Sequence, residues 1–261
     1  MTTAASPIVK LLYFNLRARG EPLKMMLLHS GLEWQNQVVT FEEWLGDDGM
    51  KHSMPNKQVP VLEILSDGGK LLPESIDIAK WIAERCSPSL IPTTKELQAK
   101  AEKLFQLPDV TKDDDIVADG IKYRLGLANP LLNFYSIEKA SKLLPGFLQR
   151  VPTTYSYLET ELEEGPYFCG SDLCYVDFQL FHYIDNVYTL DGGFTLKQYP
   201  KLQQFYVRMK ELAAVKKHLK ERPKCGTKQI GNPKGCIIYE ISNPSKDIPT
   251  IKEYIASMSS S

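Results

Sequence analysis

The chain has 261 residues, of which 43% are hydrophobic and 24% are charged, and its formal net charge is −1. This length exceeds that of one average domain, so two domains are expected. A near-neutral chain without a basic run gives no reason to expect a nucleic-acid partner. No stretch approaches the ~18 consecutive apolar residues of a membrane-spanning helix, so no membrane partner is expected either.

The cysteines and the N-terminus bear on the compartment. The five cysteines are odd in number, and no two of them show C-x-x-C spacing. This argues against a disulfide framework and against a structural metal site. Reduced thiols are the simpler interpretation. Residues 1–7 lack the apolar core of a signal peptide, so the sequence predicts a cytoplasmic protein without a metal.

The first eighty-odd residues alternate strand and helix signals. Four short apolar runs are typical of strands and cover residues 8–14, 34–41, 59–65 and 70–72. Two amphipathic segments predict helices, one opening at Glu21-Pro22 and ending at Gly31, the other over residues 74–86. Ser66-Asp67-Gly68-Gly69 predicts a tight turn. The order indicates a small mixed sheet with helices packed on it.

The remainder of the chain has mainly helical periodicity. Residues 87–94 are rich in Ser, Pro and Thr and predict a linker. Helices are expected over residues 95–106, 114–127, 130–144, 152–164, 175–190 and 200–221, and no strand is expected before the tail. Pro108, Pro145 and Pro152 are expected to kink or split the longer helices. In the tail, residues 237–239 predict a short strand and residues 248–258 a short helix.

Several separated motifs accompany this element order. They are Tyr13 to Pro22 (YFNLRARGEP), Trp44 with Lys51, Val59-Pro60, Glu74-Ser75 and Phe168 to Phe178 (FCGSDLCYVDF). With these motifs, residues 7–222 resemble the cytosolic glutathione transferases, in particular the tyrosine-using sigma, mu and pi classes. The resemblance implies a thioredoxin-like, α/β N-terminal domain followed by an all-helical C-terminal domain.

The resemblance also implies the domain roles and the partners. Residues 1–86 would bind glutathione as co-substrate, and residues 95–222 would line a site for a hydrophobic electrophile. Residues 223–261 form a C-terminal extension for which the sequence indicates no role. A homodimer is implied, because sites in this family take a residue from the partner subunit.

Tyr13 and Arg19 are the implied catalytic residues. In the family the tyrosine ends the first strand and points at the bound thiol, and Arg19 matches an arginine that adds positive charge there. A free thiol has a pKa of about 8.5, and only the thiolate attacks electrophiles well. A phenol that donates a hydrogen bond to the sulfur favours the anion. Taken alone, Tyr13 also fits an aromatic residue at a strand end, and Arg19 a surface charge.

The resemblance assigns the cysteinyl and glycine contacts of glutathione as well. A cis bond before Pro60 would expose the backbone of Val59 to the cysteinyl part, as an added strand would. Gln58 fits another contact close to the backbone. Trp44 and Lys51 would bind the glycine carboxylate through an indole N–H and an ammonium group. Read without the family, Pro60 is an edge-strand proline and Lys51 a surface lysine.

Glu74 and Ser75 are implied to hold the γ-glutamyl group. The start of the helix and the Ser75 hydroxyl suit its carboxylate, and Glu74 suits its ammonium group. Ser75 is equally well explained as a helix cap. Asp109 is the candidate acid that the partner subunit supplies near the same ammonium group. Asn56 stands where mu and pi members insert an aromatic side chain across the dimer interface.

The motif at Phe168 to Phe178 matches the family's helix-capping segment. Cys174 occupies the cap position, where a Ser or Thr is usual, and hydrogen-bonds more weakly. Asp177 is therefore expected to be structural and not catalytic.

Conjugation of the glutathione thiolate to hydrophobic electrophiles is the function that the resemblance implies. A sigma-type prostaglandin isomerase and a hydroperoxide-reducing peroxidase stay open, because Tyr13 would serve each of them. From a different class, a non-catalytic relative that acts as a ligand-binding or structural protein is the alternative. A thioredoxin-like oxidoreductase is disfavoured, because no cysteine precedes Cys86.

Overall fold

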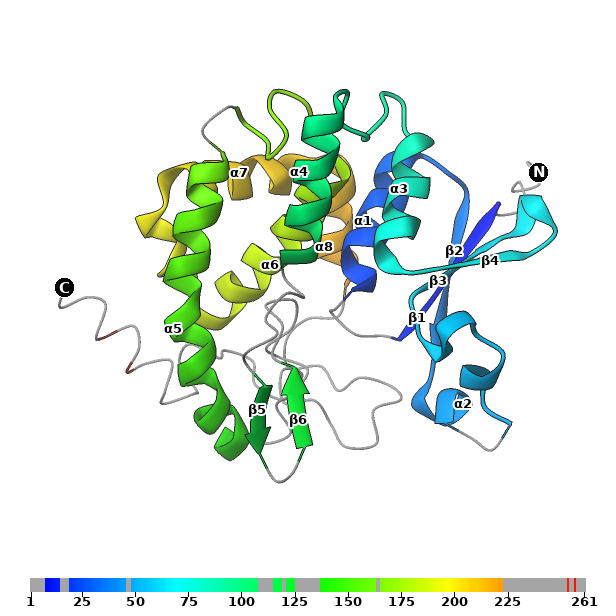
Figure 1. Ribbon diagram of the computed structural model, residues 1–261, viewed down its shortest axis with the longest axis horizontal. Coiled ribbons are helices and arrows are strands. Elements are labelled where there is room, and N and C mark those ends of the chain that lie inside the picture. Colours follow the sequence, from blue (N-terminus) through cyan, green and yellow to red (C-terminus); the bar gives the residue numbers. More distant parts are fainter. Residues whose placement is uncertain are drawn as a thin grey trace.

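The computed structural model describes two groups of elements, a sheet with its helices and a helical second part (Figure 1). The described residues are 8–14, 19–45, 48–107, 115–118, 121–124, 137–162, 165–222 and the single positions 253 and 256.

A four-stranded mixed sheet forms the first part. Its strands are β1 (Val9–Phe14), β2 (Trp34–Val39), β3 (Val61–Ile64) and β4 (Lys70–Pro73), in the order β2-β1-β3-β4. β1 pairs parallel with β2 and antiparallel with β3, and β4 pairs antiparallel with β3. Its helices are α1 (Gly20–Ser30), α2 (Phe41–Leu45) and α3 (Ser75–Glu84). The predicted strands and helices of this part are confirmed, with small shifts of their ends.

Most side chains of the two central strands, β1 and β3, are buried on both faces of the sheet. The charged residues Lys10 and Glu63 are partly exposed and form an ion pair between these strands. Leu11 and Leu62 enter the large core that also contains side chains of α1 and α3. Leu12 and Val61, the next residues along, enter a smaller cluster with Trp44 of α2. This alternation follows from the two-residue period of a strand. It places β1 in the middle of the domain.

Three short 3₁₀ helices complete this part, at Met50–His52, Pro55–Lys57 and Leu65–Asp67. The last of them, with Gly68 and Gly69 at positive φ, makes the turn between β3 and β4. The predicted turn is thus present.

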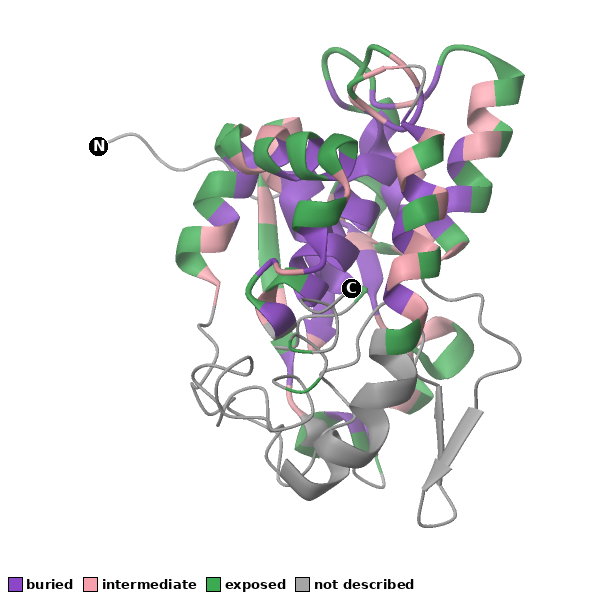
Figure 2. Cartoon of the chain, turned by 90° about the vertical axis from the view of Figure 1, so that its left-hand side faces the viewer, coloured by how far each residue is buried: buried purple, intermediate pink, exposed green. Residues whose placement is uncertain are grey.

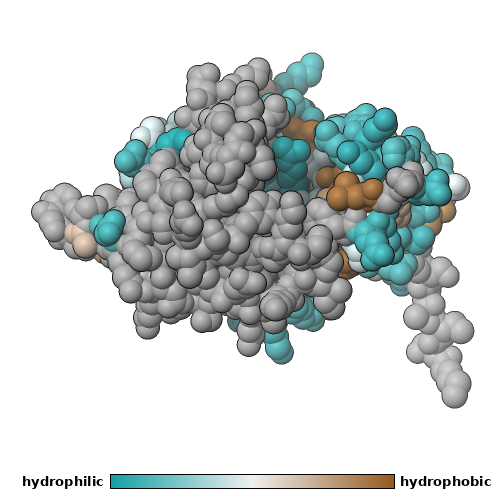
Figure 3. All heavy atoms as spheres, turned by 90° about the horizontal axis from the view of Figure 1, so that it is seen from below, coloured by the Kyte–Doolittle hydropathy of each residue, from teal (hydrophilic) through white to brown (hydrophobic). Residues whose placement is uncertain are grey.

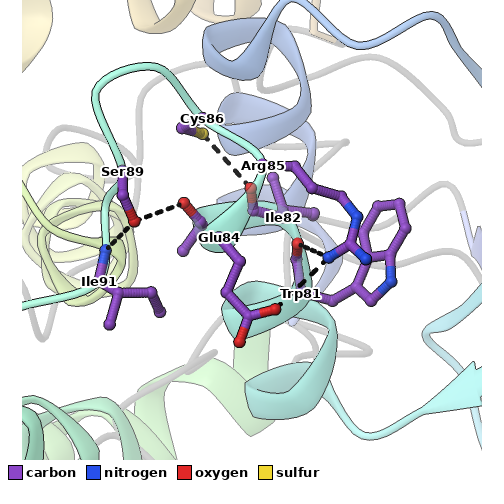
Figure 4. A network of polar contacts seen from close by, with 8 residues as sticks. Trp81, Ile82, Glu84, Arg85, Cys86, Ser89 and Ile91 are labelled. Carbon is purple, nitrogen blue, oxygen red and sulfur yellow. Dashed lines mark hydrogen bonds and ion pairs between the residues drawn. The ribbon is translucent and has the colours of Figure 1, made fainter.

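The predicted linker is bound to both parts of the chain. The Ser89 hydroxyl and the Leu90 backbone N–H both donate to the Ala83 carbonyl near the end of α3, at 3.2 and 3.0 Å. The Leu90 carbonyl in turn accepts from the backbone N–H of Tyr175, at 3.1 Å. Figure 4 shows Ser89 and Ile91 of the linker near Arg85. The Arg85 guanidinium lies 3.8 Å from the centroid of the Trp81 ring. These hydrogen bonds attach the linker to the end of α3 and to Tyr175 of the second part.

The helices of the second part are α4 (Lys95–Gln106), α5 (Ile137–Glu161), α6 (Tyr175–Asp191), α7 (Pro200–Glu211) and α8 (Ala213–Glu221), with a 3₁₀ helix at Leu196–Gln198. α6 is the central helix, since every residue from 175 to 187 is buried. Figure 2 shows buried residues concentrated where these helices meet one another and the first part. α1 packs against both α6 and α8, which joins the two parts through one core.

The expectation of a helix over residues 114–127, with no strand before the tail, is wrong. The chain forms β5 (Asp115–Ala118) and β6 (Ile121–Arg124), which pair antiparallel. Their β-branched residues favour strands, and Asp-Gly between them is a hairpin sequence. These two local signals outweigh the helical spacing of the apolar positions.

The expected helix boundaries were also wrong at two places. The two helices expected over residues 130–144 and 152–164 are one helix, α5, which runs through Pro145 and Pro152. Val151, Tyr155 and Leu158 are buried along one face, and this packing outweighs the hydrogen bonds that the prolines remove. Conversely, the helix expected over residues 200–221 is interrupted at Leu212, whose ψ of 128° is extended.

Two further observations concern the outside of the molecule. Hydrophilic side chains cover most of the described surface in Figure 3, with small hydrophobic patches between them. In the part of the chain that the structure describes, each helix is too short or too polar to cross a lipid bilayer.

The strand expected over residues 237–239 and most of the helix expected over 248–258 lie outside the described residues.

Candidate active site

A small cleft opens beside the carboxyl end of β1, where β3 begins and β4 ends. Its lining residues are Arg19, Gln58, Val59, Pro60, Pro73, Glu74 and Ser75. Six of these seven are residues that the sequence predicts for glutathione, and the seventh, Pro73, ends β4 directly before Glu74. Three segments that are far apart in the sequence therefore meet at one place.

The peptide bond between Val59 and Pro60 is cis, as expected. β3 begins only at Val61, so Val59 lies just outside the paired part of the strand and borders the cleft. Gln58 is exposed beside it. The backbone at Val59 is thus placed where an extended peptide can lie next to the sheet.

Glu74 and Ser75 form the start of α3. Ser75 is the first residue of the helix, and the Glu74 carbonyl accepts from the Ile78 backbone N–H at 2.9 Å. Glu74 has φ 67° and ψ 122°, a conformation that residues other than glycine rarely adopt. The α3 N-terminus borders the cleft, and it offers backbone N–H groups and a partial positive charge to an anion.

Tyr13 lies against the first residue of α1. Its side chain is 5% exposed, and a β-carbon on Gly20 would come within 2.2 Å of the ring. Burial raises the pKa of Tyr13 well above its ordinary value, although the Arg19 charge and a hydrogen bond from the Gly20 backbone act in the opposite direction. The phenol therefore keeps its proton and remains a donor at neutral pH. Tyr13 is not among the residues that line the cleft, whereas Arg19 is.

The structure does not bring the other predicted contacts into the cleft. Trp44 is 7% exposed and packs edge-to-face on Phe14, with ring centroids 5.5 Å apart. Lys51 is half-buried on the 3₁₀ helix at Met50–His52. Neither residue lines the cleft. Asp109 lies outside the described residues.

Asp177 has a structural position at the start of α6. Its two carboxylate oxygens accept from the backbone N–H groups of Phe168, at 3.0 Å, and Cys174, at 2.7 Å. Burial raises the pKa of Asp177 to about 6, and those two hydrogen bonds act in the opposite direction. The carboxylate completes the capping box in which Cys174 is the cap residue.

Sequence reasoning missed a group of buried charges where α1 packs against α6 and α8. Glu21, in the first turn of α1, lies 2.7 Å from His218 of α8 and 3.2 Å from Lys24. Arg222 pairs with Asp185 of α6 at 2.6 Å. The acidic first turn of a helix was the signal available at Glu21, and it indicates a helix start and not a partner. Among the described residues, no three His, Cys, Asp or Glu side chains gather as metal ligands would.

Comparisons with known proteins test the resemblance and the fold. Residues 128–222 match the family model described as "Glutathione S-transferase, C-terminal domain". A probable glutathione S-transferase 8 of Caenorhabditis elegans is 26% identical over 215 residues, which cover 82% of this chain and 96% of that protein. The class-mu 28 kDa glutathione S-transferase isozyme of Schistosoma japonicum is 28% identical over 201 residues, which cover 75% of this chain and 88% of that protein.

Solved structures confirm the predicted fold. A structure described as rat hPGDS complexed with a quinoline superimposes with a TM-score of 0.66 at 20% identity, over 84% of this chain and 98% of that chain. The prostaglandin synthase D of Nilaparvata lugens gives 0.64 at 20% identity, over 83% and 100%. A thioredoxin-like domain followed by a helical domain is therefore the architecture of this chain. In sequence the chain is similar to glutathione S-transferases, including a class-mu isozyme, and its residues 128–222 match the C-terminal domain of that family.

Proposed function

We propose that this protein joins the thiolate of glutathione to hydrophobic electrophiles. The observation that carries the proposal is the cleft, where six residues chosen from the sequence for glutathione contact line one space. The relatives named as glutathione S-transferases extend over most of this chain and support the same activity.

The cleft has matched groups for the γ-glutamyl end of glutathione. The α3 N-terminus and Ser75 bind the carboxylate, because unpaired N–H groups and a partial positive charge face it. The Glu74 carboxylate binds the ammonium group. The Val59 backbone pairs with the cysteinyl residue as an added strand does. These contacts direct the thiol toward the carboxyl end of β1, where Tyr13 lies.

Tyr13 stabilises the thiolate in this proposal. A buried phenol with a raised pKa remains protonated and donates a hydrogen bond to the sulfur. Arg19, at the edge of the cleft, adds a positive charge that favours the anion further. The thiol proton leaves to solvent, the sulfur lone pair forms the new C–S bond, and the leaving group departs with its electron pair.

The remaining roles belong to the same proposal. Trp44 and Lys51 bind the glycine carboxylate, and Asp109 of a partner subunit contacts the ammonium group in a homodimer. The first domain, residues 1–86, binds glutathione, the helical domain, residues 95–222, lines the electrophile site, and the protein acts in the cytoplasm. No described residue indicates a role for the extension over residues 223–261.

A second candidate function is the isomerisation of a prostaglandin-like endoperoxide. The solved structure of a prostaglandin synthase D with the same fold favours it. This reaction also begins with a glutathione thiolate, so it uses the same cleft and the same Tyr13. Product analysis with an endoperoxide substrate separates it from conjugation.

The test measures the binding of glutathione first and the turnover of an electrophile second. Full-length protein is passed over immobilised glutathione and then assayed with a chloro-nitrobenzene electrophile. Retention with turnover supports the proposed transferase. Retention without turnover would favour a ligand-binding relative, and loss of both would contradict the assignment of the cleft.

A further inference from the structure

Asn56 lies next to Glu74 and has no role in the glutathione contacts described above. Its Nδ2 atom lies 2.7 Å from Oε1 of Glu74. A carboxylate oxygen only accepts hydrogen bonds, so the amide must present its NH₂ group here. One oxygen of Glu74 is thereby fixed by a neutral donor.

The backbone at both residues is unusual. Asn56 has φ 55° and ψ 8°, in the left-handed region that asparagine tolerates better than most residues. Glu74 has φ 67°, which only glycine adopts readily. Conformations of this kind persist where surrounding contacts hold them, and they cluster at binding sites.

The hydrogen bond joins two segments that line the cleft. Asn56 belongs to the 3₁₀ helix Pro55–Lys57, which leads directly into Gln58 and Val59. Glu74 leads directly into Ser75 and α3. The contact therefore links the segment proposed for the cysteinyl residue of glutathione to the segment proposed for its γ-glutamyl group.

We propose that Asn56 is a positioning residue that aims the Glu74 carboxylate at the ligand's α-ammonium group. The inference rests on the proposed function, since it requires glutathione in this cleft. A lysine or arginine at this place would neutralise the carboxylate that it oriented. The asparagine amide orients it and leaves its full negative charge.

The hydrogen bond restricts the rotamers of an exposed Glu74 side chain before the ligand binds. Both side chains are exposed, so an unrestrained Glu74 would sample several rotamers and lose them on binding. Fixing the side chain beforehand lowers that entropic cost. Oε1 is held by Asn56, and Oε2 stays available to accept from an ammonium group. The arrangement selects ligands with a free α-amino group.

The test compares two ligands by calorimetry. One is glutathione, and the other is its analogue with a glutaryl in place of the γ-glutamyl group, which lacks only the ammonium. Asn56→Gly removes the amide and keeps a residue suited to positive φ. We expect about 3- to 10-fold weaker binding of glutathione in this variant and an affinity for the glutaryl analogue within about 2-fold of that of the unmodified protein.

The control variant is Lys57→Gly, in the same 3₁₀ helix and also at positive φ, 51°. It adds the same backbone freedom and retains the Asn56 amide, so both affinities should stay within about 2-fold. In steady state, Asn56→Gly should raise KM for glutathione and leave kcat unchanged.

The outcomes separate the inference from the proposed function. Equal weakening of both ligands in Asn56→Gly would overturn the inference, because the residue would then support the loop and not the ammonium contact. An unchanged affinity for glutathione would overturn it as well. If the unmodified protein bound neither ligand, the proposed function would fail, and this inference with it.

Discussion

Glu21 and His218 are 197 positions apart in the sequence, and Oε2 of Glu21 lies 2.7 Å from Nε2 of His218. The Nζ atom of Lys24 lies 3.2 Å from the other carboxylate oxygen. Although burial alone would raise it, Lys24 and His218 hold the pKa of Glu21 well below its usual range. The pair ties the start of α1, next to Tyr13 and Arg19, to the helix α8. The carboxylate remains charged throughout the neutral range.

Glu21→Gln is expected to destabilise the protein by about 2–4 kcal/mol. The amide matches the carboxylate in shape, but it leaves the buried Lys24 ammonium without a counter-charge. Urea unfolding at pH 7 measures the effect. Glu211→Gln is the matched control, because its ion pair with Lys216 is exposed and should contribute less than about 1 kcal/mol. Equal losses in the two variants would mean that the buried pair contributes no more than a surface one.

The residues of the cleft were predicted from the resemblance to the glutathione transferases, and the motifs that carry this resemblance are local. A proline before an apolar run and Glu-Ser before an amphipathic segment are short patterns, and the element order shows which strand each adjoins. The structure places Val59, Pro60, Glu74 and Ser75 together around one space. The fold of the first part followed from the same kind of evidence.

The hairpin within residues 114–127 was missed although its signal is local, because the helical spacing of the apolar positions was given more weight. Two other features depend on distant contacts. The continuity of α5 through Pro152 depends on a buried face that no window of sequence displays. The hydrogen bond between Asn56 and Glu74 joins two segments that are separated in the sequence. Neither of these two features has a signature at a fixed spacing.

Tyr13→Phe should lower kcat by about 10²-fold while KM for glutathione changes little. The phenol donates to charge on the sulfur and contributes little to holding the peptide, and the loss of one such donor costs about 10²–10³ in rate. Ultraviolet absorbance of the bound thiolate, followed against pH, should show a raised thiol pKa. Tyr157→Phe on α5 is the control and should leave both measurements unchanged. Unaltered turnover in Tyr13→Phe would remove this residue from the mechanism.

Asp177→Asn is expected to destabilise the protein by about 1–3 kcal/mol. An asparagine presents one oxygen and one NH₂ group, so one of the two backbone donors, at Phe168 or Cys174, loses its acceptor. Thermal unfolding checks this. Asp172→Asn, on the exposed turn before α6, is the comparison and should unfold at nearly the original temperature. A catalytic Asp177 would instead reduce turnover without a change in stability.

His182 should make the protein less stable as the pH falls below neutrality. The ring is 2% exposed in the centre of α6, and burial lowers the pKa of His182 from 6.5 to about 4, although Glu21 and Asp185 act in the opposite direction. The unfolded chain therefore binds a proton more readily than the folded one. The stability that this difference contributes is complete above pH 6.5 and is lost as the pH falls through about 4, by at most about 3 kcal/mol.

Urea unfolding at several pH values between 7.5 and 4 measures this dependence. His182→Gln keeps a polar side chain that does not titrate, so its free energy of unfolding should change less with pH than that of the unmodified protein. His52→Gln, at an exposed position on the 3₁₀ helix Met50–His52, should retain the original dependence. If His182→Gln and the unmodified protein lost stability in parallel, the acid sensitivity would belong to other groups. A flatter profile in that variant alone would locate it in the buried polar group around α6, which also contains Asp185 and Arg222.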